Sequence, residues 1–198
     1  MHRLFGPVSG SFAALLAAPV VMAQPAPAAR AAPATSPALK GQKRIILHTR
    51  DGQAIPVGTV VFIPTATGSR FDVQIAPERT TTYFLSMRNF RCVEGDEVFC
   101  HVPYPYPLGE TVAPGRLDWL EHALLFLSKS PKEFGARFEN GIYFRMEIDG
   151  SRIVGTPQGI DLEDIGSPPD DPTIPPYSRI DRFDEPEGDN WIARLTIE

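Results

Sequence analysis

The feature that most constrains the fold is the chain's only pair of cysteines, Cys92 and Cys100. The residues between them centre on Gly95-Asp96-Glu97, a composition that favours a tight turn between two antiparallel strands. Residues that face each other in such a hairpin are close enough for a disulfide bond, which stabilises a fold by about 2–3 kcal/mol when the loop is this short. The sequence therefore predicts a disulfide-stapled hairpin. A redox-active pair is the alternative, but the spacing is not C-x-x-C.

The N-terminus predicts export, and disulfide bonds form in exported proteins. A short basic segment, residues 1–3, precedes an apolar run over residues 12–21, and the sequence Val-Met-Ala at 21–23 suits a signal peptidase. Cleavage is predicted between Ala23 and Gln24, in a signal whose alanine-rich composition favours a bacterial periplasm. The apolar run is shorter than the about 20 residues of a membrane span, so no span is predicted after cleavage; an uncleaved anchor is the alternative.

Composition divides the remaining chain into two parts. Residues 24–42, QPAPAARAAPATSPALKGQ, lack a periodic apolar pattern and are predicted to be a disordered tether. Residues 43–198 have the length of a single domain, within which residues 157–189 are predicted to be an acidic, proline-rich loop. Loss of residues 1–23 leaves 18 basic and 24 acidic side chains, and this acidic balance without a basic stripe disfavours nucleic acid as a partner.

Alternating apolar residues predict that most of the domain is β-strand. Between Thr80 and Arg91 the alternation changes phase, which predicts one long strand with a β-bulge near Arg88-Asn89. Asp149-Gly150 is the strongest hairpin turn, and Asp51-Gly52 is a second turn signal. The predicted strands are residues 44–50, 58–63, 70–76, 80–91, 142–148, 151–155 and 191–197.

One helix is predicted over residues 114–128, where Leu117, Leu120, Leu124 and Leu127 have helical spacing. With roughly seven or eight strands in meander order, the expected fold class is mainly β, of the α+β kind. The expected architecture is an antiparallel, curled or barrel-like sheet with this one main helix packed on it and the stapled hairpin within it.

The segment after the hairpin supplies the candidate binding surface. Val102-Pro103-Tyr104-Pro105-Tyr106-Pro107 alternates proline with tyrosine, and the prolines favour a stiff, extended backbone that presents the two rings. Exposed aromatic rings on a stiff backbone suit recognition, because little side-chain entropy is lost on binding. The candidate surface therefore comprises Tyr83, His101, Tyr104 and Tyr106. The alternative is that the tyrosine rings cover the hydrophobic core.

Catalytic and metal-binding signals are weak. His48, His101 and His122 remain after export, but they have none of the spacings of a zinc site, and the acid-rich segment 161–171 lacks the order of a calcium loop. No nucleophile elbow and no phosphate-binding loop is present in the sequence. We therefore predict no catalytic residue, metal or cofactor.

These features predict an exported binding or protein-interaction module without enzymatic activity. Its partner would be another envelope protein or a small ligand. One alternative is a small exported hydrolase in which His101, Glu121 or His122 acts as a general base. Another is a structural component of the cell envelope that assembles through the proline-rich tether.

Overall fold

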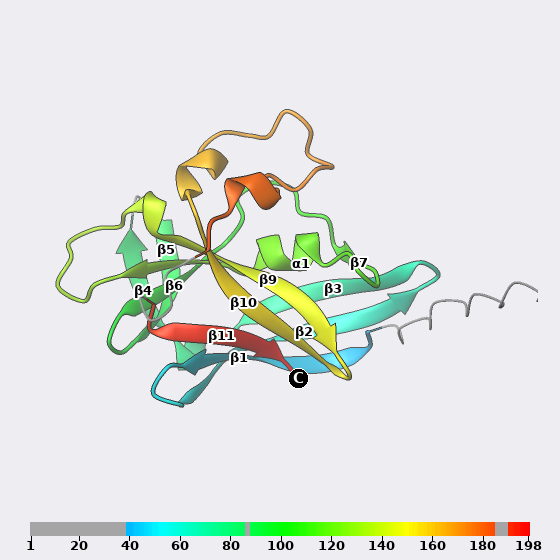
Figure 1. Ribbon diagram of the computed structural model, residues 1–198, viewed down its shortest axis with the longest axis horizontal. Helices are drawn as coiled ribbons and strands as arrows, with labels where there is room; N and C mark the ends of the chain where they lie inside the picture. The colour runs from blue at the N-terminus through cyan, green and yellow to red at the C-terminus, as the bar shows by residue number, and fades with distance from the viewer. Residues whose placement is uncertain (1–38, 86–87, 185–189) are drawn as a thin grey trace, which may run out of the picture. The chain divides into compact units, whose positions relative to one another are not determined.

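A computed structural model describes residues 39–85, 88–184 and 190–198 (Figure 1). The predicted signal peptide and residues 24–38 of the predicted tether lie outside this part of the chain. Within it, no helix is both long enough and apolar enough to cross a membrane.

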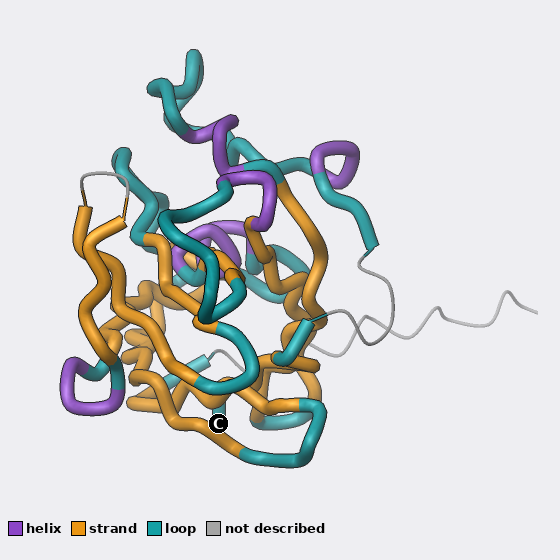
Figure 2. The backbone as a smooth tube through the Cα atoms, turned by 90° about the vertical axis from the view of Figure 1, so that its left-hand side faces the viewer, coloured by secondary structure: helices purple, strands orange, loops and turns teal. Residues whose placement is uncertain are grey.

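The described chain is mainly β, as predicted, and its strands form one antiparallel sheet (Figures 1 and 2). The strand order is β4-β5-β6-β8-β9-β10-β11-β1-β2-β3-β7, so most neighbours are consecutive in the chain and β1 joins the sheet beside the last strand. The strands are β1 (Gly41–Thr49), β2 (Ala54–Thr65), β3 (Gly68–Ile75), β4 (Thr81–Leu85), β5 (Arg88–Glu94), β6 (Val98–Val102), β7 (Thr111–Val112), β8 (Leu125–Lys129), β9 (Gly141–Asp149), β10 (Arg152–Ile160) and β11 (Ile192–Ile197).

Helical structure among the described residues is short. The α-helix α1 spans Asp118–Ala123, and the 3₁₀ turns are η1 (Pro77–Arg79), η2 (Phe138–Asn140), η3 (Leu162–Ile165) and η4 (Arg179–Asp181). The segment that carries η3 and η4 runs from gold to orange at the top of Figure 1. It corresponds to most of the predicted acidic loop, although β10 continues to Ile160 before that loop begins.

The predicted disulfide hairpin is confirmed. Cys92 on β5 lies directly opposite Cys100 on β6, their Cα atoms are 3.9 Å apart, and their sulfur atoms are bonded. The pairing of Glu94 with Val98 leaves a three-residue turn, in which the Gly95 N–H donates to the Glu97 carbonyl over 3.0 Å. Both cysteines are fully buried, so the staple is part of the core.

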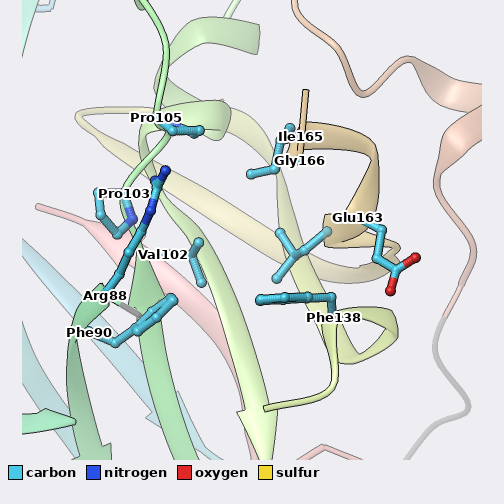
Figure 3. Close-up of a pocket in the computed structure, with 10 residues that line it drawn as sticks. Arg88, Phe90, Val102, Pro103, Pro105, Phe138, Glu163, Ile165 and Gly166 are labelled. Atoms are coloured by element: carbon cyan, nitrogen blue, oxygen red, sulfur yellow. The ribbon is translucent and has the colours of Figure 1, made fainter. Parts of the chain in front are cut away.

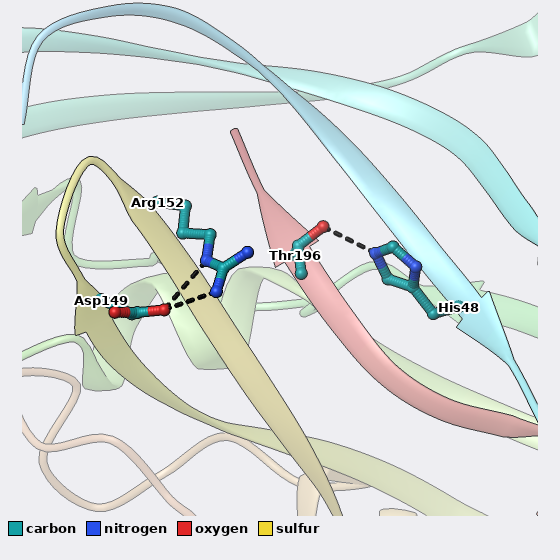
Figure 4. Close-up of polar contacts among 4 residues, drawn as sticks. All are labelled: His48, Asp149, Arg152 and Thr196. Carbon is teal, nitrogen blue, oxygen red and sulfur yellow. Dashed lines mark hydrogen bonds and ion pairs between the residues drawn. The ribbon is translucent and has the colours of Figure 1, made fainter.

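The predicted hairpin at Asp149-Gly150 is also present. Arg152 pairs with Asp149 across the turn, and Gly150 has a φ of 62°, which glycine adopts without strain. The Arg152 guanidinium donates from Nε and Nη2 to Asp149 Oδ2, over 2.9 and 2.7 Å (Figure 4). These bonds close the turn between β9 and β10.

The prediction of one long bulged strand over residues 80–91 is wrong. Leu85 pairs with Arg88, and the antiparallel register continues without a shift to Thr81 opposite Cys92. The segment is therefore two strands, β4 and β5, with residues 86–87 between them lying outside the described part. The change of phase in the apolar pattern comes from reversal of the chain, and no bulge is needed.

The predicted helix over residues 114–128 is wrong in its extent. Only Asp118–Ala123 is helical, and the chain continues as the strand β8 from Leu125. This strand lies between β6 and β9, and all five of its residues are buried. Leu125 and Leu127 pack on one face of the sheet and Phe126 on the other, so the apolar run that looked helical belongs to a strand buried on both faces.

Two hydrophobic clusters lie on the two faces of the sheet. The first, here called the helix-side cluster, includes Leu120 of α1 together with Phe99, Phe126 and Phe144. The second, the disulfide-side cluster, contains both cysteines and Phe90, Val102, Leu125, Leu127, Tyr143, Ile160, Leu162, Ile165 and Tyr177. Because Leu162, Ile165 and Tyr177 belong to the loop after β10, that loop covers the disulfide side of the sheet.

Candidate ligand-binding pocket

The structure does not bring the four residues of the predicted surface onto one face. His101 on β6 follows Cys100 and so points to the helix side, where its ring meets Phe126 edge-on at 5.5 Å. Its Nε2 atom donates to the Ala123 carbonyl over 3.0 Å. Tyr83 packs against the disulfide-side cluster instead, and its hydroxyl donates to Glu94 Oε1 over 3.1 Å.

Tyr104 and Tyr106 do lie together. Their rings meet edge-on with centroids 5.7 Å apart, and both are half-buried. Tyr104 packs against the disulfide-side cluster and approaches the ring of His122, at 6.3 Å between centroids. Tyr104 therefore covers part of the core, while the prolines beside it have a different role.

Those prolines line an apolar pocket of about 380 Å³ (Figure 3). This volume lies within the range of small-molecule sites, which are mostly apolar and carry few polar groups. One side of the pocket comes from the disulfide hairpin and its exit, and the other comes from η2 and η3. The lining residues are Arg88, Phe90, Val102, Pro103, Pro105, Phe138, Leu162, Glu163, Ile165 and Gly166.

Strand alternation explains the hairpin side of the pocket. Phe90 lies two residues before Cys92 on β5, and Val102 lies two residues after Cys100 on β6, so both face the same side as the disulfide. The disulfide holds these two strands together two residues away from Phe90 and Val102. Pro103 and Pro105 then stiffen the chain as it leaves β6.

Hydrogen bonds hold the opposite side in place. Asp161 caps η3 by accepting a bond from the Glu163 N–H over 2.9 Å, and the Gly166 N–H donates to the Glu163 carbonyl over 2.8 Å. The hydroxyl of the buried Tyr177 donates to the Asp161 carbonyl over 2.7 Å. These bonds fix Leu162 and Ile165 against the sheet, so the pocket is largely preformed.

His122, a candidate base in the hydrolase alternative, has both ring nitrogens engaged. Nδ1 donates to the Asp118 carbonyl over 2.7 Å, and Nε2 accepts the Tyr177 N–H over 3.0 Å. The ring is fully buried and stacks on Tyr177 with centroids 5.7 Å apart. Burial lowers the pKa of His122 to about 4, so the ring is neutral near pH 7 and anchors the loop that carries Tyr177.

Glu121, the neighbouring candidate, also uses both carboxylate oxygens within the protein. Oε1 accepts the Met146 N–H over 2.6 Å, and Oε2 accepts the Tyr143 hydroxyl. Strand β8 pairs with β9 only at Gly141 and Ile142, so the pairing ends before it reaches Met146. The Glu121 carboxylate accepts the Met146 N–H in place of a backbone carbonyl of β8. Burial raises the pKa of Glu121 above its usual range. Its role in this arrangement is to hold α1 on the free edge of β9.

Glu121 also lines a second hollow, a polar cleft of about 460 Å³. The other lining residues are Asp118, Arg145, Gln158, Arg179, Arg182 and Asp184. Several are paired with protein groups: Arg145 with Glu147 at 3.3 Å, Gln158 with Asp184 at 2.9 Å, and Arg182 stacked over the Tyr143 ring at 4.4 Å. A ligand that enters this cleft has to displace water from charged side chains, which costs free energy. An apolar ligand therefore gains more free energy in the apolar pocket, where it removes apolar surface from water.

His122 makes the stability of the protein depend on pH. Its pKa is about 4 in the folded chain and about 6.5 when unfolded, so the unfolded state takes up the proton first as the pH falls. The stabilisation is complete above pH 6.5 and is lost between pH 6.5 and pH 4, by up to about 1.4 kcal/mol per pH unit. In urea titrations at several pH values, wild type should lose more stability over this window than His122→Gln. Parallel curves for the two proteins would contradict this assignment.

The remaining histidine, His48 on β1, lies away from the pocket. Its Nε2 atom is 2.8 Å from the hydroxyl of Thr196 on β11, which ties the two strands together (Figure 4). Among residues 39–85, 88–184 and 190–198, no three His, Cys, Asp or Glu side chains are grouped closely enough to hold a metal ion.

Comparison with known proteins adds no assignment. No protein-family model matches the chain, and no curated protein or solved structure matches it.

Proposed function

We propose that the protein is an exported binding protein that holds a small, mainly apolar molecule in the pocket between the disulfide hairpin and η3. The pocket itself carries the proposal: it has about 380 Å³ of space and is lined mainly by apolar side chains and prolines. Burial of an apolar ligand against these side chains is favourable by about 25 cal/mol for each Å² removed from water.

The preformed walls support this proposal. Little entropy is lost on binding when the lining residues are already held in place. Here a disulfide joins the strands of one wall, and capping bonds to Asp161 fix the turn that forms the other. Exposed apolar side chains elsewhere, such as those of Phe134 and Ile180, do not line this pocket.

We propose that the protein works outside the cytoplasm, in the bacterial periplasm. The signal-like N-terminus motivates this location, and a buried disulfide is compatible with an oxidising compartment.

We also infer that the sheet curls, as the sequence predicted. Strands β3 and β4 are nine positions apart in the strand order, a distance of about 43 Å in a flat sheet at 4.8 Å per strand. The chain passes from Ile75 to Thr81 through five linking residues, which can span at most about 21 Å. Curling of the sheet reconciles the two distances.

The pocket is tested by two phenylalanines four residues apart. Phe138 lines the pocket, whereas Phe134 is fully exposed and does not. We expect the neutral fluorescent probe N-phenyl-1-naphthylamine to bind wild type saturably, and Phe138→Ala to raise its Kd about tenfold, because part of the apolar contact is lost.

The matched control is Phe134→Ala, which should leave the Kd of the probe unchanged. Equal effects of the two substitutions, or fluorescence that rises without saturation, would show that the probe adsorbs to exposed apolar surface and would contradict the proposal.

A further inference from the structure

The apolar pocket has charged groups at two places on its rim, Arg88 and Glu163. Arg88 begins β5 two residues before Phe90, so its side chain lies on the pocket side of the strand. Figure 3 shows the Arg88 side chain running along the pocket wall beside Pro103, with its guanidinium toward Pro105. In the same view the Glu163 carboxylate points away from the pocket. The cationic group therefore lies along the cavity, and the anionic group does not face it.

Within the described ranges, the Arg88 guanidinium forms no ion pair or side-chain hydrogen bond. Some other arginines have acidic partners, such as Arg70 with Glu110 at 2.7 Å and Arg152 with Asp149 at 2.7 Å; what distinguishes Arg88 is its place in the lining of the apolar pocket. The guanidinium of Arg88 thus keeps its N–H donors for another acceptor, and a carboxylate matches their fork geometry.

We infer that the ligand is an amphipathic monocarboxylic acid, whose apolar body fills the pocket and whose carboxylate pairs with Arg88. This inference rests on the proposed function, because it names the chemical class of ligand for the same pocket. Phe90, Val102, Leu162 and Ile165 contact the apolar body, and the polar end stays at the rim, where it keeps part of its hydration. Because Arg88 is exposed, we expect the acid to be favoured by about tenfold over a neutral analogue, at the lower end for charge-assisted hydrogen bonds.

The test compares ligands that share one apolar body. Decanoate, decanol and decylamine are each titrated against wild type carrying N-phenyl-1-naphthylamine, below the solubility limit of decanol and below the concentrations at which the two charged ligands form micelles. Displacement by decanoate should give a Kd about tenfold lower than displacement by decanol, and decylamine should bind no better than decanol. A second pair, 1-naphthoate and 1-naphthylmethanol, distinguishes an aromatic acid from an alkyl acid, and a preference for the acid in either pair supports the inference.

Two arginines on the same strand provide the variants. Arg88→Met removes the charge but keeps an apolar stem, so it should weaken the binding of decanoate about tenfold more than that of decanol and thereby abolish the preference for acids. Arg91→Met is the matched control, because Arg91 points to the opposite face of β5 and donates to Thr82 Oγ1 over 2.8 Å. This control should retain the full preference.

The outcomes separate the inference from the proposed function. Equal affinities of wild type for acid and alcohol in both pairs, or a preference that survives in Arg88→Met, would overturn the inference while the proposed function stands. If decanol and decanoate both fail to displace the probe, and Phe138→Ala binds the probe like wild type, the proposed function fails and the inference fails with it.

Discussion

Replacement of Glu121 by alanine is expected to lower the free energy of unfolding by about 3–5 kcal/mol. Glu121 is 5% exposed, and its carboxylate accepts hydrogen bonds from the Met146 N–H and the Tyr143 hydroxyl. Alanine would leave both donors buried without a partner, and it would remove the contact that seats α1 on the free edge of β9. Urea unfolding followed by the fluorescence of Trp119 and Trp191 measures the loss.

Two further variants show which property of Glu121 matters. Glu121→Gln keeps a carbonyl oxygen for the Met146 N–H and removes the buried charge, so its loss should be less than half of that of alanine. Glu147→Ala, at an exposed position on β9, should change stability by less than about 0.5 kcal/mol. If Glu121→Ala is as stable as Glu147→Ala, Glu121 does not anchor the helix.

Removal of the disulfide by the double substitution Cys92→Ala and Cys100→Ala is expected to cost about 3 kcal/mol. The chain-entropy model gives about 2.5 kcal/mol for so short a loop, and loss of the two fully buried sulfur atoms adds a small cavity. The binding of N-phenyl-1-naphthylamine should also weaken, because Phe90 and Val102 are held by the strands that the disulfide joins.

The single variants serve as controls for this experiment. Each one breaks the bond and also leaves a free thiol, so both should be destabilised about as much as the double variant. A double variant within 1 kcal/mol of wild type, with unchanged probe binding, would contradict a role for the disulfide in holding the pocket.

Short sequence patterns predicted the strands and turns that depend mainly on neighbouring residues. Alternating apolar residues placed β3, β9 and β11, short apolar runs before a turn or proline placed β1 and β2, and the glycine turns placed two hairpins. The strand β8 escaped detection because it is buried on both faces and therefore does not alternate. The reversal between β4 and β5 escaped because Ser86-Met87 contains no glycine, proline, asparagine or aspartate, and a single serine is a weak turn signal.

The pocket could be predicted only in part. The hairpin side could be predicted, because Phe90 and Val102 lie two residues from Cys92 and Cys100 and so share their face of the sheet. By the same alternation, His101 faces the opposite side. The opposite side comes from Phe138 and from Leu162–Ile165, far along the chain, and only the fold brings them to the hairpin. Leu162 and Ile165 alone were not a sufficient signal, because Ile174 and Ile180 of the same acidic loop are also apolar and yet are exposed.

The central claim, that the pocket binds an apolar molecule, is tested most directly by methyl-resolved NMR of the intact protein during titration with decanol. The methyl groups of Val102, Leu162 and Ile165 line the pocket, whereas Ile63, Ile174 and Ile180 are exposed elsewhere. The account predicts saturable shifts confined to the first set. Shifts of the exposed isoleucines alone, or no saturable shift in either set, would contradict it.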